Sequence, residues 1–98
     1  MKPSISVLQD LKALAPDLMR LGVLHLYLFG SQSRGDGRTD SDIDLFFDYN
    51  DPKFSLIELL NIKAYIEARM GKTADIMTRA SLHPRLKASI EQSAIKVF

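Results

Sequence analysis

The chain has no cysteine, so neither a disulfide framework nor a thiolate metal site is available to it. Its formal net charge is only +1, which argues against a broad basic surface for nucleic acid. No apolar run approaches membrane-spanning length, and the opening residues 1–4 lack the apolar stretch of a signal peptide. These absences predict a cytoplasmic protein with no membrane association and no direct nucleic-acid binding.

The chain has 98 residues, of which 46% are hydrophobic and 26% charged. This composition suits one globular unit, and we expect a single domain over residues 1–98. Hydrophobic spacing predicts an α/β order of elements. The expected helices are a first helix through residue 14 with a further turn at 17–21, then 55–70 and 84–93, and the expected strands are 24–29, 43–47, 73–77 and 95–98.

The longest expected helix has clear end signals. Ser55 and Glu58 have the spacing of a capping box, and Gly71 is placed to end the helix. Ser4 or Ser6 is expected to cap the first helix in the same way. The apolar face of the longest helix is predicted from its spacing to contain Leu56, Leu59, Leu60, Ile62, Ile66 and Met70.

Residues 28–45, LFGSQSRGDGRTDSDIDL, carry the strongest functional signal. An apolar run ends in Gly30-Ser31, and after ten intervening residues Asp42 and Asp44 flank one apolar residue. On an extended chain these two carboxylates project from the same face, about 6–7 Å apart. Paired anionic oxygens suit Mg²⁺, whose shell is completed by water and phosphate oxygens.

The Gly-Ser turn before the carboxylates suits a phosphate. Gly30 has no side chain, so its backbone can approach a phosphate closely, and Ser31 offers a hydroxyl and an N–H as donors. Either motif alone is commonly an ordinary turn or a pair of solvated carboxylates. Their conjunction predicts a nucleoside triphosphate held through divalent ions, and so nucleotidyl transfer.

Gly30-Ser31, Arg34-Gly35 and Ser41-Asp42-Ile43-Asp44-Leu45 together resemble the signature of the DNA polymerase β-type nucleotidyltransferase superfamily. The short chain resembles its minimal nucleotidyltransferase (MNT) branch. The resemblance implies a small mixed or antiparallel sheet flanked by helices, two Mg²⁺ ions, ATP as substrate and a third carboxylate on a neighbouring strand.

Asp75 is the candidate for that third carboxylate. It lies in an expected strand after Gly71, and alternation turns it away from Ala74 and Ile76, the expected core pair. If this strand lies beside 42–47, Asp75 joins Asp42 and Asp44. The three would then bind metal, and Asp75 would help to take a proton from the attacking hydroxyl.

Basic residues near these motifs have two interpretations. Arg34 is a candidate nucleotide ligand because its planar guanidinium suits phosphate, and Arg38 is a weaker candidate. Both could equally be loop arginines that are solvated or paired with nearby aspartates. Lys63 and Arg79 could touch nucleotide or be solvated. Asp48 is expected in a turn rather than at the metal.

The MNT resemblance also implies a partner. Members are typically encoded beside a small helical HEPN protein, an RNase toxin, and act as antitoxins by transferring AMP from ATP to one of its tyrosines. Two alternatives stay open. The first is a non-catalytic module that neutralises a partner by contact, for which the lack of an acceptor domain and the apolar tail 94–98 are the reasons. The second is a transferase for a small hydroxylated molecule. A homo-oligomer is also possible.

Overall fold

The computed structural model describes residues 3–30 and 43–98, and its centre is a four-stranded sheet. The strands are β1 (Val23–Phe29), β2 (Ile43–Tyr49), β3 (Ala74–Thr78) and β4 (Ile95–Lys96). In the order β3-β2-β1-β4, β1 pairs antiparallel with β2 and β4, whereas β2 and β3 run parallel. The expected mixed sheet flanked by helices is confirmed.

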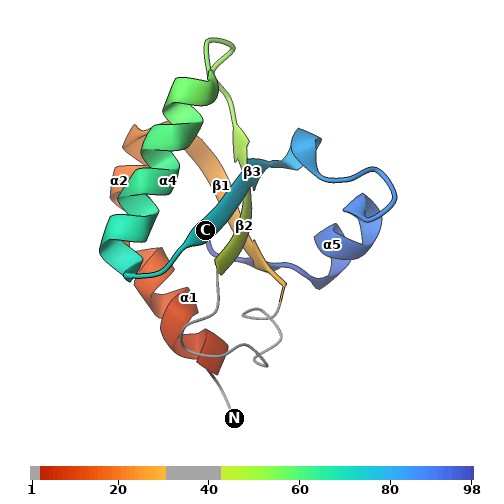
Figure 1. Ribbon diagram of the computed structural model, residues 1–98, viewed down its shortest axis with the longest axis horizontal. Coiled ribbons are helices and arrows are strands. Elements are labelled where there is room, and N and C mark those ends of the chain that lie inside the picture. Colours follow the sequence, from red (N-terminus) through yellow and green to blue (C-terminus); the bar gives the residue numbers. More distant parts are fainter. Residues whose placement is uncertain (1–2, 31–42) are drawn as a thin grey trace.

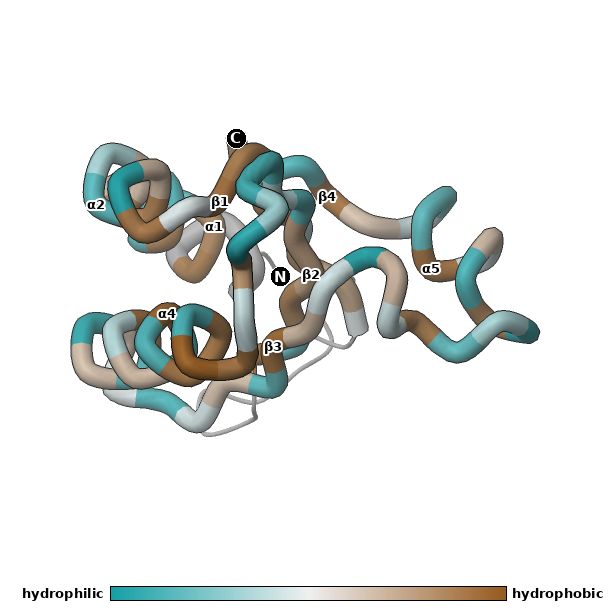
Figure 2. Tube along the Cα trace, turned by 90° about the horizontal axis from the view of Figure 1, so that it is seen from above, coloured by the Kyte–Doolittle hydropathy of each residue, from teal (hydrophilic) through white to brown (hydrophobic). Residues whose placement is uncertain are grey.

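The helices form unequal layers on the two faces of this sheet. One face is covered by α1 (Pro3–Ala13), α2 (Ala15–Arg20) and α4 (Leu56–Met70), while α5 (Lys87–Ser93) lies on the other side (Figures 1 and 2). A short 3₁₀ helix, η1 (Arg79–Ser81), follows β3. Parallel strands need a long crossover, and α4 supplies it between β2 and β3.

The hydrophobic core lies between the sheet and the three-helix layer. Alternation along β2 turns Ile43, Leu45 and Phe47 into this core, where all three are fully buried. Ile62 and Ile66 of α4 meet them and are also fully buried. Asp44 and Asp48 therefore belong to the opposite, open face of the sheet.

The ends of α4 match the sequence prediction, and its apolar face matches it in part. Ser55 and Glu58 form the capping box, and Gly71 ends the helix in the left-handed conformation at φ +68°. Leu56 and Leu60, however, are 66% and 52% exposed. They share an i, i+4, i+7, i+11 stripe with Lys63 and Glu67, which runs along the flank of α4 rather than over the sheet.

Other boundaries also differ from the expectation. The first helix begins at Pro3, before both serines expected to cap it, because proline is well suited to a first helical turn. The last helix covers only 87–93. The regular strand expected at 95–98 covers only 95–96.

The C-terminal tail is part of the fold. Val97 is 4% exposed, its N–H donates to the Leu26 carbonyl at 2.7 Å, and the Leu26 N–H donates to the Phe98 carbonyl at 3.2 Å. The tail thus packs on its own sheet and core, so the tail itself no longer supports the alternative of a contact-only module. Within 3–30 and 43–98 no helix has the length and apolar character needed to cross a bilayer.

The two faces of α4 give a matched test of this core. Ile66→Ala should lower the free energy of unfolding by about 2–5 kcal/mol, because it leaves a cavity at a fully buried position. Leu60→Ala, at a half-exposed position of the same helix, should cost less than about 1 kcal/mol. Urea unfolding followed by circular dichroism measures both, and equal losses would contradict the assigned core face.

Candidate active site

Two predicted site carboxylates meet on the open face of the sheet. Asp44 of β2 and Asp75 of β3 are direct partners in the parallel register, and the Ile43 N–H donates to the Thr73 carbonyl at 3.0 Å beside them. Neighbouring strands lie about 4.8 Å apart, so the two side chains leave the sheet side by side. Asp75 is exposed and Asp44 is half-buried, while Ala74 and Ile76 turn into the core.

Gly30 completes one side of this site. It follows β1, whose last residue, Phe29, pairs with Asp44. The backbone of Gly30 has φ +78°, which disfavours residues with a side chain, and an added Cβ would lie 3.1 Å from Asp44 Cγ and closer still to Oδ2. The Asp44 carboxylate therefore fills the space that a side chain at position 30 would need.

Four other predicted residues lie outside the described part of the chain. These are Ser31, Arg34, Arg38 and Asp42. Among the residues that are described, no three His, Cys, Asp or Glu side chains gather as a metal-holding group. Asp44 and Asp75 nevertheless place two carboxylates on one face of the sheet, and Mg²⁺ is commonly held in proteins by one or two carboxylates.

An arginine that the sequence left ambiguous organises the rest of the open face. Arg79 Nε and Nη2 donate to the two carboxylate oxygens of Asp48 at 2.7 and 3.0 Å, and Nη1 donates to Glu91 of α5 at 2.7 Å. Its guanidinium also lies 4.8 Å from the ring centre of Tyr27 and 5.0 Å from that of Phe46. Arg79 thus ties α5 to the sheet.

These contacts shift the pKa values of Asp48 and Arg79. The hydrogen bonds from Arg79 hold the pKa of Asp48 below its ordinary value, against the opposing effect of burial. The same bonds, with those to Glu91, raise the pKa of Arg79. Asp48 lies in β2 rather than in the turn expected for it, and its carboxylate is used by Arg79.

Aromatic side chains line the same face next to the two carboxylates. Phe46 is fully buried although it faces away from the main core, because Tyr27 stacks on it with ring centres 4.7 Å apart and Phe29 packs at 5.7 Å. These ring contacts join β1 to β2 on the face that carries Asp44. An alternating pattern in the sequence could have revealed the shared face, but not the stacking partners.

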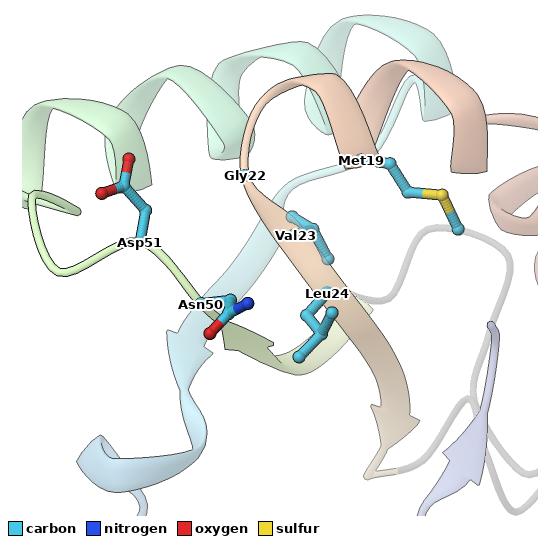
Figure 3. A pocket seen from close by; sticks show the side chains of 6 residues that line it. All are labelled: Met19, Gly22, Val23, Leu24, Asn50 and Asp51. Atoms are coloured by element: carbon cyan, nitrogen blue, oxygen red, sulfur yellow. The ribbon is translucent and has the colours of Figure 1, made fainter.

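Two hollows among the described residues lie away from this carboxylate pair. One of about 300 Å³ is lined by Met19, Gly22, Val23, Leu24, Asn50 and Asp51 (Figure 3). Its strand residue Val23 is six positions from Phe29, about 20 Å along β1. A second hollow of about 280 Å³ lies beside Asp48, Arg79 and Lys87. Neither Asp44 nor Asp75 lines either of these hollows.

The family is decided by comparison of the whole chain. Residues 6–97 match the family model described as nucleotidyltransferase domain. The chain belongs to the nucleotidyltransferase domain family. This nucleotidyltransferase therefore carries Asp44 and Asp75 on a scaffold whose enzymatic class is transfer of a nucleotidyl group.

Relatives by sequence refine the class. A Methanocaldococcus jannaschii protein described as a candidate protein adenylyltransferase is 35% identical over 87 residues, covering 89% of this nucleotidyltransferase and 92% of the relative. Protein adenylyltransferase MntA of Thermococcus cleftensis is 30% identical over 78 residues, covering 80% and 78% of the two chains. The MNT resemblance of the sequence is confirmed by these relatives.

Solved structures share the fold. One described as a candidate minimal nucleotidyltransferase superposes with a TM-score of 0.79 at 28% identity, covering 97% of this chain and 95% of the other. A crystal structure described as the toxin–antitoxin with AMP-PNP gives a TM-score of 0.72 at 20% identity, covering 89% and 72%. At that identity the second likeness shows the fold alone.

Alanine substitutions at two glycines distinguish the effect of a local clash from the effect of backbone strain. Gly30→Ala should lower nucleotidyl transfer about 10²-fold, because the new methyl group displaces the Asp44 carboxylate. Gly71→Ala has a similar positive φ but no atom within 4 Å of the added Cβ, so it should cost about 1 kcal/mol of stability and leave transfer intact. Initial rates and urea unfolding measure these effects. Equal transfer rates in the two variants would refute the clash.

The Asp48–Arg79 pair predicts a pH dependence of stability. Because the folded pKa of Asp48 is lowered, its stabilisation is complete above the ordinary carboxyl pKa and is lost as pH falls through the lower folded value. Asp48→Asn should cost about 1 kcal/mol at pH 7 and flatten the acid limb of the stability curve below about pH 5. Chemical unfolding at several pH values measures this. Asp10→Asn, at an exposed position of α1, is the control and should follow the wild-type slope.

Proposed function

We propose that this chain transfers AMP from ATP to a tyrosine hydroxyl of a HEPN-type partner toxin and so acts as its antitoxin. The relatives named protein adenylyltransferases support the reaction class. Neighbours of the same fold described as a toxin–antitoxin, one with the ATP analogue AMP-PNP, support the nucleotide and the kind of partner. The observation that carries the proposal is the cross-strand pair of Asp44 and Asp75 beside Gly30.

Each site residue has a stated role in this proposal. Asp42, Asp44 and Asp75 hold two Mg²⁺ ions, and Gly30, Ser31 and Arg34 bind the triphosphate. The bound Mg²⁺ supplies charge neutralisation for the attacking and leaving oxygens. Asp44 is held for this task by Gly30 on one side and by the β2–β3 ladder on the other.

The reaction balances as a single displacement. The tyrosine oxygen forms a bond to the α-phosphorus of ATP while the bond from that phosphorus to the bridging oxygen of the β-phosphate breaks. Pyrophosphate leaves, and the phenolic proton passes to Asp75, the more exposed of the two described carboxylates. The protein contributes mainly position and electrostatic stabilisation.

The test uses ATP labelled at the α-phosphate, Mg²⁺ and the protein encoded by the gene beside the gene for this chain. We expect label on a tyrosine of the partner, located by mass spectrometry. Asp44→Asn and Asp75→Asn should lower the rate on the order of 10²–10³-fold, because each removes a charge that the transition state requires. Asp10→Asn, at an exposed position of α1, should transfer normally.

Three other outcomes of this experiment would contradict the proposal, each in a different way. Tight association without label, by wild type and by both aspartate variants alike, would identify a contact-only module. Label that appears on a small hydroxylated molecule in place of the protein would assign a different acceptor. Undiminished transfer by Asp44→Asn and Asp75→Asn would remove the assigned site itself.

A further inference from the structure

Ala74, the residue before Asp75, has backbone groups that the sheet does not use. In the parallel pairing of β3 with β2, the Thr73 carbonyl accepts the Ile43 N–H. Backbone groups alternate sides along a strand, so the N–H and carbonyl of Ala74 point away from β2 toward the outer edge. Ala74 is fully buried, and buried backbone groups require hydrogen-bond partners.

Helix α4 supplies both partners. Lys63 Nζ donates to the Ala74 carbonyl at 2.7 Å, and Glu67 Oε2 accepts the Ala74 N–H at 2.8 Å. The two side chains are one helical turn apart and are partly buried. Together they complete the edge of β3 at one residue, as the backbone of a further strand would.

The geometry favours this contact over a simple ion pair within the helix. Lys63 Nζ and Glu67 Oε2 are 3.6 Å apart, farther than either is from Ala74. A lysine that precedes glutamate at i, i+4 is also in the weaker of the two orders for helix stability. Both side chains therefore bond to the edge of β3 more closely than to each other.

We propose that Lys63 and Glu67 are positioning residues that hold Ala74 so that Asp75 stays beside Asp44. A shift of a strand by one residue turns every side chain to the other face. Two directional bonds to one residue oppose such a shift and fix the Asp44–Asp75 register. The catalytic consequence rests on the proposed function, whereas the effect on the strand does not.

The first measurement is amide hydrogen exchange without metal or nucleotide. Glu67→Ala should speed exchange at Ala74 and Asp75 at least about tenfold relative to Leu45 in the sheet interior, because the edge of β3 loosens while the core stays. Glu67→Gln keeps an oxygen for the Ala74 N–H and should restore slow exchange, although it removes the charge facing Lys63. Lys63→Met tests the hydrogen bond to the Ala74 carbonyl, and Asp10→Ala is a charge-matched control at an exposed position of α1.

The second measurement is transfer against Mg²⁺ concentration. Glu67→Ala should lower kcat or raise the Mg²⁺ requirement about ten- to a hundred-fold, with Glu67→Gln near wild type, since residues that orient a metal ligand have effects of this size. Unchanged exchange at Asp75 in both Glu67→Ala and Lys63→Met would overturn the positioning role. So would wild-type transfer by Glu67→Ala when Asp75→Asn is inactive. An active Asp75→Asn would instead defeat the proposed function, and the exchange data would still decide the positioning role.

Discussion

The parallel pairing of β2 with β3 is the constraint on which the rest of this structure depends. It places Asp44 directly across from Asp75, although 31 positions separate them in the chain. The pairing requires α4 as a crossover, and α4 in turn requires the buried residues Ile62 and Ile66 to seat it on the sheet. The helix that makes the core is thus the same helix that makes the acidic pair possible.

The two faces of the sheet differ in chemical character. One face is a dry apolar layer under α1, α2 and α4, whereas the other exposes carboxylates over a support of stacked rings. Phe46 stays fully buried on the face away from the main core, because Tyr27 and the guanidinium of Arg79 cover its ring. Asp44 and Asp48 therefore leave β2 on either side of a buried aromatic ring.

Local patterns predicted the elements and the carboxylate pair. Alternation around Asp44 and Asp75 placed both opposite core residues, and the capping box and Gly71 defined α4. Contacts between residues that are distant in the chain could not be predicted from the sequence. Arg79 pairs with Asp48 and Glu91, which are 31 and 12 residues away, and nothing in the composition distinguishes them from other charges.

Helical spacing alone likewise placed Leu56 and Leu60 in the core, because periodicity does not reveal where a sheet ends. Asp42, Ser31 and Arg34 stay predictions, since they lie outside the described residues.

The contact of Lys63 and Glu67 with Ala74 has a consequence for assembly. An uncovered outer strand is a template on which a second chain can extend the sheet, in a regular dimer or in an aggregate. At Ala74 that template is already taken by a lysine and a glutamate, so an incoming strand would have to expel two charged groups before it could bond. At this position of β3, addition of a further strand is therefore expected to be disfavoured.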